Sequence, residues 1–325
     1  MDGDFEKLVR HKQYSTILFN FLKLRLRESI GEKDIQQCMD DVETGKLTSA
    51  SVLDKLRSLS SEREKKMSEE DVKTWNISRG AARVREMRAF DGVFDKKNIT
   101  RYLDIGCGNG AITEAIGINI LGLKKEQIIG TDIETWAGHT HIKETSDKIT
   151  FKPMVGKSKL PVESNSVNVV TIFMMMHHVN EEDLLELMQE IYRVATDNAV
   201  IILRDHDSPN NMVDSLINIE HGIFEVIIEK LTTGAEFQKN YYGKYKSKRD
   251  WIMNFDQCGF DTFGQSININ RPTRPFYQVF KKNHKKPIGT KTIPELRTTA
   301  RQLGIKLKGN FDTEGIKRAI ISGRR

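Results

Sequence analysis

The sequence predicts an α/β protein: a parallel sheet with helices on both faces, a helical segment before it and a smaller helical segment after it. One observation is a series of short apolar runs rich in β-branched residues, at residues 102–105, 128–133, 167–173 and 199–203. A second is that helical patterns separate these runs; in residues 181–194, apolar side chains recur every three or four positions. Strands that are apolar on both faces and alternate with helices are typical of a parallel sheet covered on both sides.

The segments around this sheet define four zones of the chain. Residues before the first strand are expected to be helical, because apolar residues such as Leu18 and Leu22 recur at helical spacing. Two closing strands are expected around residues 262–263 and 276–280. We therefore divide the chain into a helical extension (1–75), the α/β domain (76–280), a basic linker (281–291) and a small helical module (292–325).

The charge of the chain is unevenly distributed. The 325 residues include 51 Lys and Arg against 45 Asp and Glu, a net charge of +6. Residues 281–325 hold 13 basic and 3 acidic residues, a net +10, so the first 280 residues carry 38 basic and 42 acidic residues, a net −4. A mildly acidic body with a strongly basic tail indicates an anionic partner, most often nucleic acid. The alternative is a basic terminus that only increases solubility.

Other features of the sequence argue against several classes of protein. It has no run of about 18 apolar residues that could cross a membrane. The first residues, 1–5, are acidic and lack the basic and apolar parts of a secretion signal. Cys38, Cys107 and Cys258 are scattered and form neither a CxxC pair nor a disulfide framework. We expect an intracellular protein with no membrane partner and no metal site; the cytoplasm is the favoured compartment and the nucleus is the alternative.

A glycine-rich turn follows the first strand. Gly106, Gly108 and Gly110 are spaced two apart and lead into a helix. Glycine lets the backbone turn sharply and lets a ligand approach without a Cβ in the way. The spacing differs from the dinucleotide fingerprint G-x-G-x-x-G, and the Lys-Ser/Thr pair of a phosphate-binding P-loop is missing.

Two acids accompany this turn. Asp132 ends the second strand, 22 residues after Gly110, where a carboxylate can accept hydrogen bonds from both ribose hydroxyls of a nucleoside. Asp104 lies directly before the turn, where it could hold an ammonium group, directly or through water. An acid at this place disfavours a phosphate. The predicted ligand is therefore a nucleoside with a cationic amino-acid end and no phosphate.

In their order along the chain, these residues resemble the class I S-adenosylmethionine-dependent methyltransferases of the type 11 kind. The resemblance covers about residues 75–280 and includes the lead into the fourth strand (160–170), the run after it (174–179) and the Gly-Phe pair that ends the segment 251–260. It implies a Rossmann-like sheet of seven strands with S-adenosylmethionine as cofactor. The cofactor-binding residues that it implies are Asp104, Gly106, Gly108, Gly110, Asp132, Ile133, Met154 and Val155.

The sequence departs from the family pattern at two places. Asn168 stands where the family commonly has Asp, and the third-strand region 151–156 lacks the acid that usually contacts the adenine amino group. Adenine would then be held by backbone groups and apolar packing. These departures leave open a non-catalytic, nucleic-acid-binding protein with a degenerate methyltransferase fold.

The chain lacks several motifs that are typical of methyltransferases with particular methyl acceptors. There is no Asn/Asp-Pro-Pro-Tyr/Phe motif after the fourth strand, as in methyltransferases of exocyclic amino groups. There is also no Pro-Cys pair for a pyrimidine carbon and no evident Lys-Asp-Lys-Glu tetrad for ribose. These acceptor classes are therefore disfavoured.

Polar residues at the carboxyl ends of the fourth and fifth strands are the candidates for catalysis, because ligands of such sheets bind there. His178, with its neighbour His177, follows the fourth strand, and Asp205 and His206 follow the fifth. A histidine near carboxylates is suited to move a proton or to orient a substrate. Arg204 is a candidate to line the substrate pocket. The alternatives are a helix cap for the histidine pair and a solvated turn for the charged cluster.

A second substrate candidate is the segment 241–249, in which aromatic rings alternate with cations. Rings can stack on bases and cations can pair with phosphates, so Tyr242 and Lys244 are expected to contact the substrate. An ordinary exposed loop is the alternative.

The basic tail resembles SAP-like or Rho-N-like nucleic-acid-binding modules. The resemblance lies in residues 292–305, a helix and turn, and in 315–321, a second helix. It implies contacts to phosphates rather than sequence reading. The expected function is transfer of a methyl group to RNA, such as a cap or a structured RNA. A small-molecule or protein methyltransferase is the alternative among enzymes.

Overall fold

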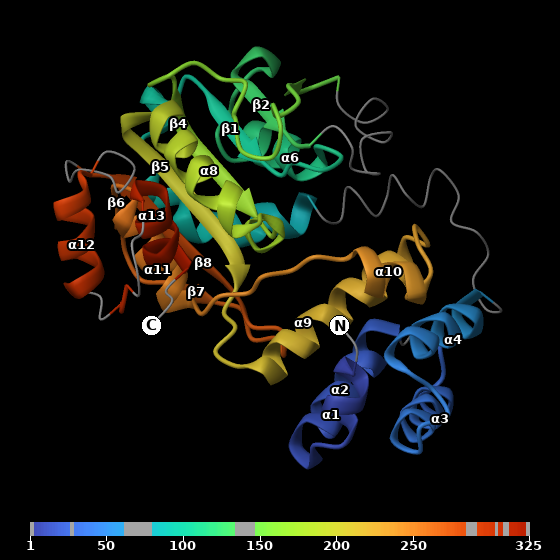
Figure 1. Cartoon of the computed structure of the whole chain (residues 1–325). Helices are drawn as coiled ribbons and strands as arrows, with labels where there is room; N and C mark the ends of the chain where they lie inside the picture. The colour runs from blue at the N-terminus through green and yellow to red at the C-terminus, as the bar shows by residue number, and fades with distance from the viewer. Residues whose placement is uncertain are drawn as a thin grey trace. The chain divides into compact units, whose positions relative to one another are not determined.

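The computed structural model describes residues 3–26, 29–61, 80–133, 147–283, 291–302, 305–307 and 312–322 (Figure 1). The chain divides into two compact units, each assembled from separate segments. The first unit comprises Met1–Asp71, His206–Ser247 and Ile269–Pro275; the second comprises Val72–Asp205, Lys248–Asn268 and Phe276–Arg325. Part of the region expected as one α/β domain thus belongs to the mainly helical first unit.

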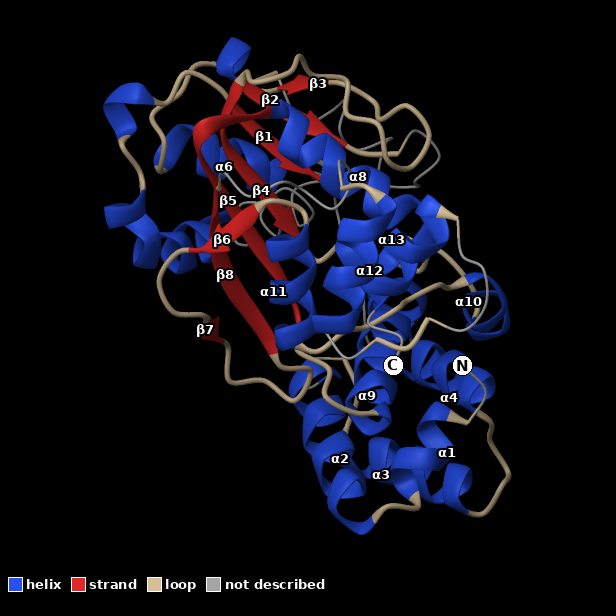
Figure 2. Cartoon of the chain, turned by 60° about the vertical axis from the view of Figure 1, so that its left-hand side comes forward, coloured by secondary structure: helices blue, strands red, loops and turns tan. Residues whose placement is uncertain are grey.

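The second unit is built on an eight-stranded sheet (Figure 2). Seven strands follow the order β3-β2-β1-β4-β5-β8-β6, and β7 pairs with β8. The pairs β1–β2, β1–β4, β2–β3 and β4–β5 are parallel, whereas β6 and β7 run antiparallel to β8. The predicted α/β fold with a mainly parallel sheet is confirmed. The strands are β1 (Tyr102–Ile105), β2 (Ile128–Thr131), β3 (Thr150–Phe151), β4 (Val167–Phe173), β5 (Ala195–His206), β6 (Phe260–Thr262), β7 (Ile267–Asn268) and β8 (Pro275–Lys282).

The two faces of the sheet have different partners because side chains alternate along each strand. Leu103 and Val170 belong to a large apolar core with helices α8 (Glu181–Val194) and α11 (Lys248–Gln257). Asp104 points the other way, to Thr113 in α6 (Ala111–Asn119). Residues 80–87 are also helical, and the shorter 3₁₀ turns are η1 (Arg88–Val93), η2 (Lys96–Asn98), η3 (Lys125–Gln127) and η4 (Met176–His178).

The C-terminal helices share the apolar core of the second unit. Helices α12 (Ile293–Gln302) and α13 (Thr313–Ser322) bury Leu296, Ile316 and Ile320 in the same cluster as α8 and α11. The expected helices of the tail are therefore present, and their apolar faces are covered by the body of the second unit.

Strand β8 extends into the region expected as a linker. Lys281 and Lys282 are its last residues. The Lys281 ammonium lies 3.9 Å from the centre of the Phe263 ring, and Lys282 lies 4.3 Å from that of Tyr192. Lysine can pack its alkyl chain and still present its charge to a ring, so these cations are compatible with a strand. Most of the expected linker, residues 284–290, lies outside the described residues.

The first unit is a helical bundle with its own core. It contains α1 (Asp4–Val9), α2 (Lys12–Leu26), α3 (Glu32–Glu43), α4 (Ser49–Ser61), α9 (Asn211–Gly222), the π-helix η5 (Ile223–Ile228) and α10 (Gly234–Asn240). Leu22, Val42 and Leu53 pack in one cluster with Leu216 and Ile223. The helical extension expected at the N-terminus thus folds with a segment from the second half of the chain.

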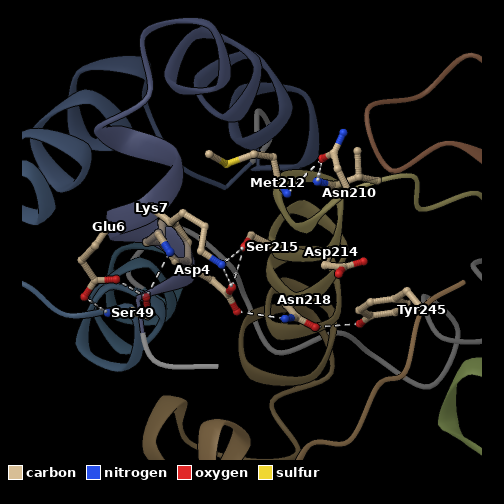
Figure 3. Close-up of polar contacts among 12 residues, drawn as sticks. Asp4, Glu6, Lys7, Ser49, Asn210, Met212, Asp214, Ser215, Asn218 and Tyr245 are labelled. Atoms are coloured by element: carbon tan, nitrogen blue, oxygen red, sulfur yellow. Dashed lines mark hydrogen bonds and ion pairs between the residues drawn. The ribbon is translucent and has the colours of Figure 1, made fainter. Parts of the chain in front are cut away.

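A buried polar network joins α1 to α9 inside this unit (Figure 3). Ser215 and Asn218 donate hydrogen bonds of 2.7 and 3.0 Å to the two carboxylate oxygens of Asp4. The Tyr245 hydroxyl donates to Asn218 Oδ1 at 2.8 Å, so the network also holds the segment after α10. Burial raises the pKa of Asp4, against the lowering effect of these hydrogen bonds and of Lys7.

In the part of the chain that the structure describes, no helix combines the length and the apolar character needed to cross a membrane.

Candidate functional site

The glycine turn has a backbone that only glycine adopts readily. Gly106, Gly108 and Gly110 have φ angles of 75°, 53° and 73°, in the left-handed region. The amide of Gly106 donates to the carbonyl of Thr131 at 2.9 Å, which ties the turn to the end of β2. A Cβ on Gly106 would lie 2.7 Å from the Cβ of Met175, so the turn also packs closely on the chain after β4.

Asp132 joins the end of β2 to the glycine turn. Its two carboxylate oxygens accept 2.8 Å hydrogen bonds from the amides of Gly108 and Ile133. The side chain therefore shapes the glycine turn and holds it at the end of β2.

Asp104 is a buried support beneath the turn. It is 3% exposed, and its two oxygens accept hydrogen bonds of 2.5 and 2.6 Å from the hydroxyls of Thr113 and Thr171. Burial raises its pKa from an ordinary 3.8 to about 6, with a further contribution from the charge of Asp132. The carboxyl thereby links β1 to both β4 and α6, whereas the sequence suggested a direct or water-mediated contact with an ammonium group.

The expected adenine-side residues occupy different environments. Met154 donates its amide to the carbonyl of Asp132 at 2.9 Å, and its side chain is buried in the core. Val155 is 65% exposed, and Ile133 is half-buried against the same core. Val155 and Ile133 therefore offer apolar surface to the adenine ring of a cofactor. Met154 instead ties its own segment to the end of β2 through its backbone.

Asn168 lies at the opposite end of the sheet from the glycine turn. It is the second residue of β4, and its side-chain oxygen accepts hydrogen bonds from the amides of Thr100 and Arg101 at 2.8 and 3.1 Å. Asn supplies this oxygen as well as Asp does. The departure from the family pattern at this position therefore concerns the start of β1 and not the cofactor site.

The histidine pair after β4 has one buried and one exposed member. His177 is 0% exposed, and its Nδ1 lies 2.8 Å from the Oδ1 of Asp205, which is also fully buried. Burial, followed by the charge of His178, lowers the pKa of His177 well below its usual value, so its imidazole is neutral. His178 is exposed, with its ring centre 4.1 Å from that of His177. The candidate acid Asp205 is thus bound to His177 inside the protein.

Arg204 points to the other face of β5 and is 4% exposed. Its Nε lies 3.9 Å from Glu86, and its guanidinium lies 5.6 Å from the centre of the Tyr277 ring. Arg83 and Tyr277 also hydrogen-bond to Glu86. This buried cluster holds the helix at 80–87 on the sheet, so Arg204 is placed in packing and not on a surface that a substrate could reach.

The remaining candidates belong to the first unit. His206 is 1% exposed, and its Nδ1 donates to the carbonyl of Thr273 at 2.7 Å. Tyr242 is 45% exposed and Lys244 is also exposed, on a segment without regular secondary structure. Tyr242 and Lys244 therefore present surface that a ligand could meet, whereas His206 is buried.

Two contributors to the site were not identified from the sequence: Thr113 and Thr171, which hold Asp104. Small hydroxyl residues in a helix and in a strand interior give no distinctive pattern. The one available signal was the polar Thr171, which lies between apolar residues of β4 on both sides.

Comparison with known proteins agrees with the class that this site defines. Residues 103–198, which include the glycine turn, Asp132 and the histidine pair, match the family model of a methyltransferase domain. The sheet with flanking helices is Rossmann-like. The match and the site support a methyltransferase that uses S-adenosylmethionine as cofactor. No curated protein matches the chain as a sequence.

Several solved structures are similar in fold. The PH0226 protein from Pyrococcus horikoshii OT3 has 16% identity and a TM-score of 0.45, over 62% of this chain and 91% of its own. The mitomycin 7-O-methyltransferase MmcR has 14% identity and a TM-score of 0.42, over 82% of this chain and 68% of its own. LepI, in complex with SAM, has 14% identity and a TM-score of 0.44, over 86% of this chain and 66% of its own. At such identity the likeness does not extend to substrate.

Proposed function

We propose that the protein transfers a methyl group from S-adenosylmethionine to RNA. The observation that supports the cofactor best is the junction of Asp132 with the left-handed glycine turn, because a carboxylate at the end of the second strand beside such a turn is suited to bind the ribose of a nucleoside. When bound, the cofactor supplies a sulfonium methyl group for in-line displacement. The protein has to position the nucleophile about 3 to 3.5 Å from that carbon and accept a proton where the nucleophile carries one.

Within the second unit, His178 is the residue we assign to the proton or to orientation of the acceptor. It is exposed, and it follows the turn whose Met175 packs on Gly106. Its partner His177 is neutral and buried, so it is unsuited to meet the acceptor itself.

RNA is proposed as the acceptor because of the surface of the two C-terminal helices. Arg297, Arg301 and Arg318 are exposed, while the apolar residues of the same helices face the core. Exposed arginines that are held on rigid helices can contact phosphates in a sequence-independent way. A basic surface of this kind supplies affinity, and the site near the glycine turn supplies the chemistry.

Calorimetry with S-adenosylmethionine tests the cofactor. The wild-type protein is expected to bind it, and Asp132→Ala is expected to weaken binding by about tenfold or more, since hydrogen bonds to a charged group are lost. Glu163→Ala is the matched control, because that acid is 84% exposed on its side chain. Equal affinity of Asp132→Ala and wild type would refute the ribose role. Absence of binding to wild type would favour the non-catalytic alternative.

The RNA acceptor is tested by charge substitution, because deleting α12 and α13 would expose the core. The triple variant Arg297→Ala, Arg301→Ala, Arg318→Ala should lower affinity for a single-stranded RNA and reduce the salt slope by about 2, at about 0.7 per contact. Lys96→Ala, Lys148→Ala, Lys159→Ala removes the same charge from other exposed sites. If both triple variants change RNA affinity and the salt slope equally, the helices contribute only net charge.

Radiolabelled methyl transfer to panels of RNA, proteins and small molecules identifies the acceptor class directly.

A further inference from the structure

The chain between β4 and α8 has an unusual conformation at its first residue. Met174 has a φ of 57°, in the left-handed region that non-glycine residues rarely adopt. Its amide donates to the carbonyl of Arg204 on β5 at 2.7 Å. Such backbone strain persists only where the surrounding structure enforces it, and it is frequent at functional sites.

The next residue packs on the glycine turn. The Cβ and Cγ of Met175 occupy the space beside Gly106, where a Cβ would come within 2.7 Å of either atom. The turn η4 then closes with a hydrogen bond of 2.9 Å from the amide of His178 to the carbonyl of Met175. A small displacement of η4 would therefore move both the glycine turn and His178.

A buried hydrogen bond holds η4 from the side of β5. Asp205 follows Arg204, so the strand that binds the backbone of Met174 also binds the ring of His177 at 2.8 Å. With Nδ1 of His177 protonated, the ring donates this hydrogen bond and the Asp205 oxygen accepts it. Arg204 and Asp205, two consecutive residues of β5, thus hold Met174 and His177 in the chain that follows β4.

We propose that Asp205 and His177 are a positioning pair: they hold η4 against the glycine turn and so present His178 to the methyl acceptor. This inference rests on the proposed methyltransferase function but concerns contacts within the chain. Asp205, which the sequence suggested as catalytic, acts in this proposal through His177 and touches no substrate.

The test uses Asp205→Ala and Asp205→Asn, with Asp197→Ala as control. Asn retains an oxygen that accepts from Nδ1 of His177, whereas Ala does not. Asp197 is on the same strand, and its side chain is 78% exposed. The readouts are the rate at which diethyl pyrocarbonate modifies His178, located by mass spectrometry, and the dissociation constant for S-adenosylmethionine.

In Asp205→Ala we expect a changed rate of His178 modification and a cofactor affinity lower by about tenfold, the equivalent of one buried hydrogen bond. Asp205→Asn and Asp197→Ala should remain within about twofold of wild type in both readouts. If Asp205→Ala matches wild type in both, or if Asn fails to rescue it, the proposal is overturned. Should the Ala variant not fold, His177→Phe keeps the ring shape without the donor and is expected to behave as Ala does.

Two outcomes separate this proposal from the function on which it rests. Saturating S-adenosylmethionine should slow the modification of His178 in wild type, and a rate unaffected by bound cofactor would contradict the placement of His178. If the wild type binds no cofactor, the proposed function fails. The modification rates of the free variants would still decide whether Asp205 positions His178.

Discussion

At the scale of single residues, Gly106 is the position where backbone angle and packing coincide. Its φ of 75° is costly for any residue with a Cβ, by about 1 to 2 kcal/mol. The added Cβ would also meet Met175, whereas at Gly122, with a φ of 68°, it would meet nothing within 4 Å. A comparison of alanine substitutions at the two glycines therefore separates the cost of the backbone angle from the cost of steric overlap with Met175.

We expect Gly106→Ala to destabilise the protein by about 1 to 3 kcal/mol more than Gly122→Ala, the usual cost of overpacking. It should also weaken binding of S-adenosylmethionine, because the turn has to shift. Urea unfolding and calorimetry measure the two effects. Equal destabilisation by the two substitutions would show that Met175 moves aside freely.

The raised pKa of Asp104 predicts a pH dependence of stability. Because the folded pKa of about 6 exceeds the ordinary 3.8, the folded state binds the proton more tightly than the unfolded state. The associated stabilisation is present below pH 3.8 and is lost as the pH rises through 6, by about 3 kcal/mol for a shift of two units.

In Asp104→Asn this part of the pH dependence should disappear. The difference in unfolding free energy between wild type and variant should therefore change between pH 4 and pH 7, which urea titrations at several pH values can follow. A difference that stays constant over this range would mean that Asp104 ionises normally in the folded protein.

At the scale of elements, the C-terminal helices show why a sequence pattern leaves two interpretations open. Apolar residues on one face of α12 and α13, with cations on the other, suit a small independent module. They suit equally a helix pair packed on a larger body, because the pattern records one buried face and not its partner. In the structure, Leu296 and Ile316 lie in the core shared with α8 and α11.

Ile316→Ala should consequently destabilise the second unit by about 2 to 4 kcal/mol. Ile316 is 0% exposed, and Arg318, two residues later on the same helix, is exposed. Arg318→Ala is the control and should change stability by less than about 0.5 kcal/mol. Hydrogen exchange of the sheet strands reports the effect; strand protection that is unchanged in Ile316→Ala would indicate an independent module.

At the scale of the whole molecule, each unit has its own apolar cluster. Leu22, in α2, is fully buried in the cluster of the first unit, and Leu24, on the same helix, is 60% exposed. Leu22→Ala should cost about 2 to 5 kcal/mol and raise hydrogen exchange in α1–α4 and α9, whereas Leu24→Ala should be nearly neutral. We expect S-adenosylmethionine affinity to remain within about twofold in both variants. A large loss of affinity in Leu22→Ala alone would show that the site depends on the first unit.

Much of the site followed from short stretches of sequence. The glycine turn needs three left-handed residues between a strand and a helix, and Asp132 has to follow the next strand, so spacing alone locates both. Arg204 and Asp205 are neighbours that the sequence treats as one charged cluster. Their side chains point to opposite faces of β5, and each finds a buried partner, which a local pattern does not reveal.

The sequence by itself determined the alternation of apolar strands and helices, the glycine turn and the net charge of the tail, because these depend on residues close together in the chain. Tertiary structure decided the contacts between distant residues: Asp104 with Thr171, His177 with Asp205, and the N-terminal helices with α9. Those pairings form only when separate segments bury their polar and apolar groups together. The role of each charged residue depends on that burial, since an exposed cation can bind a partner and a buried one is held by its own chain.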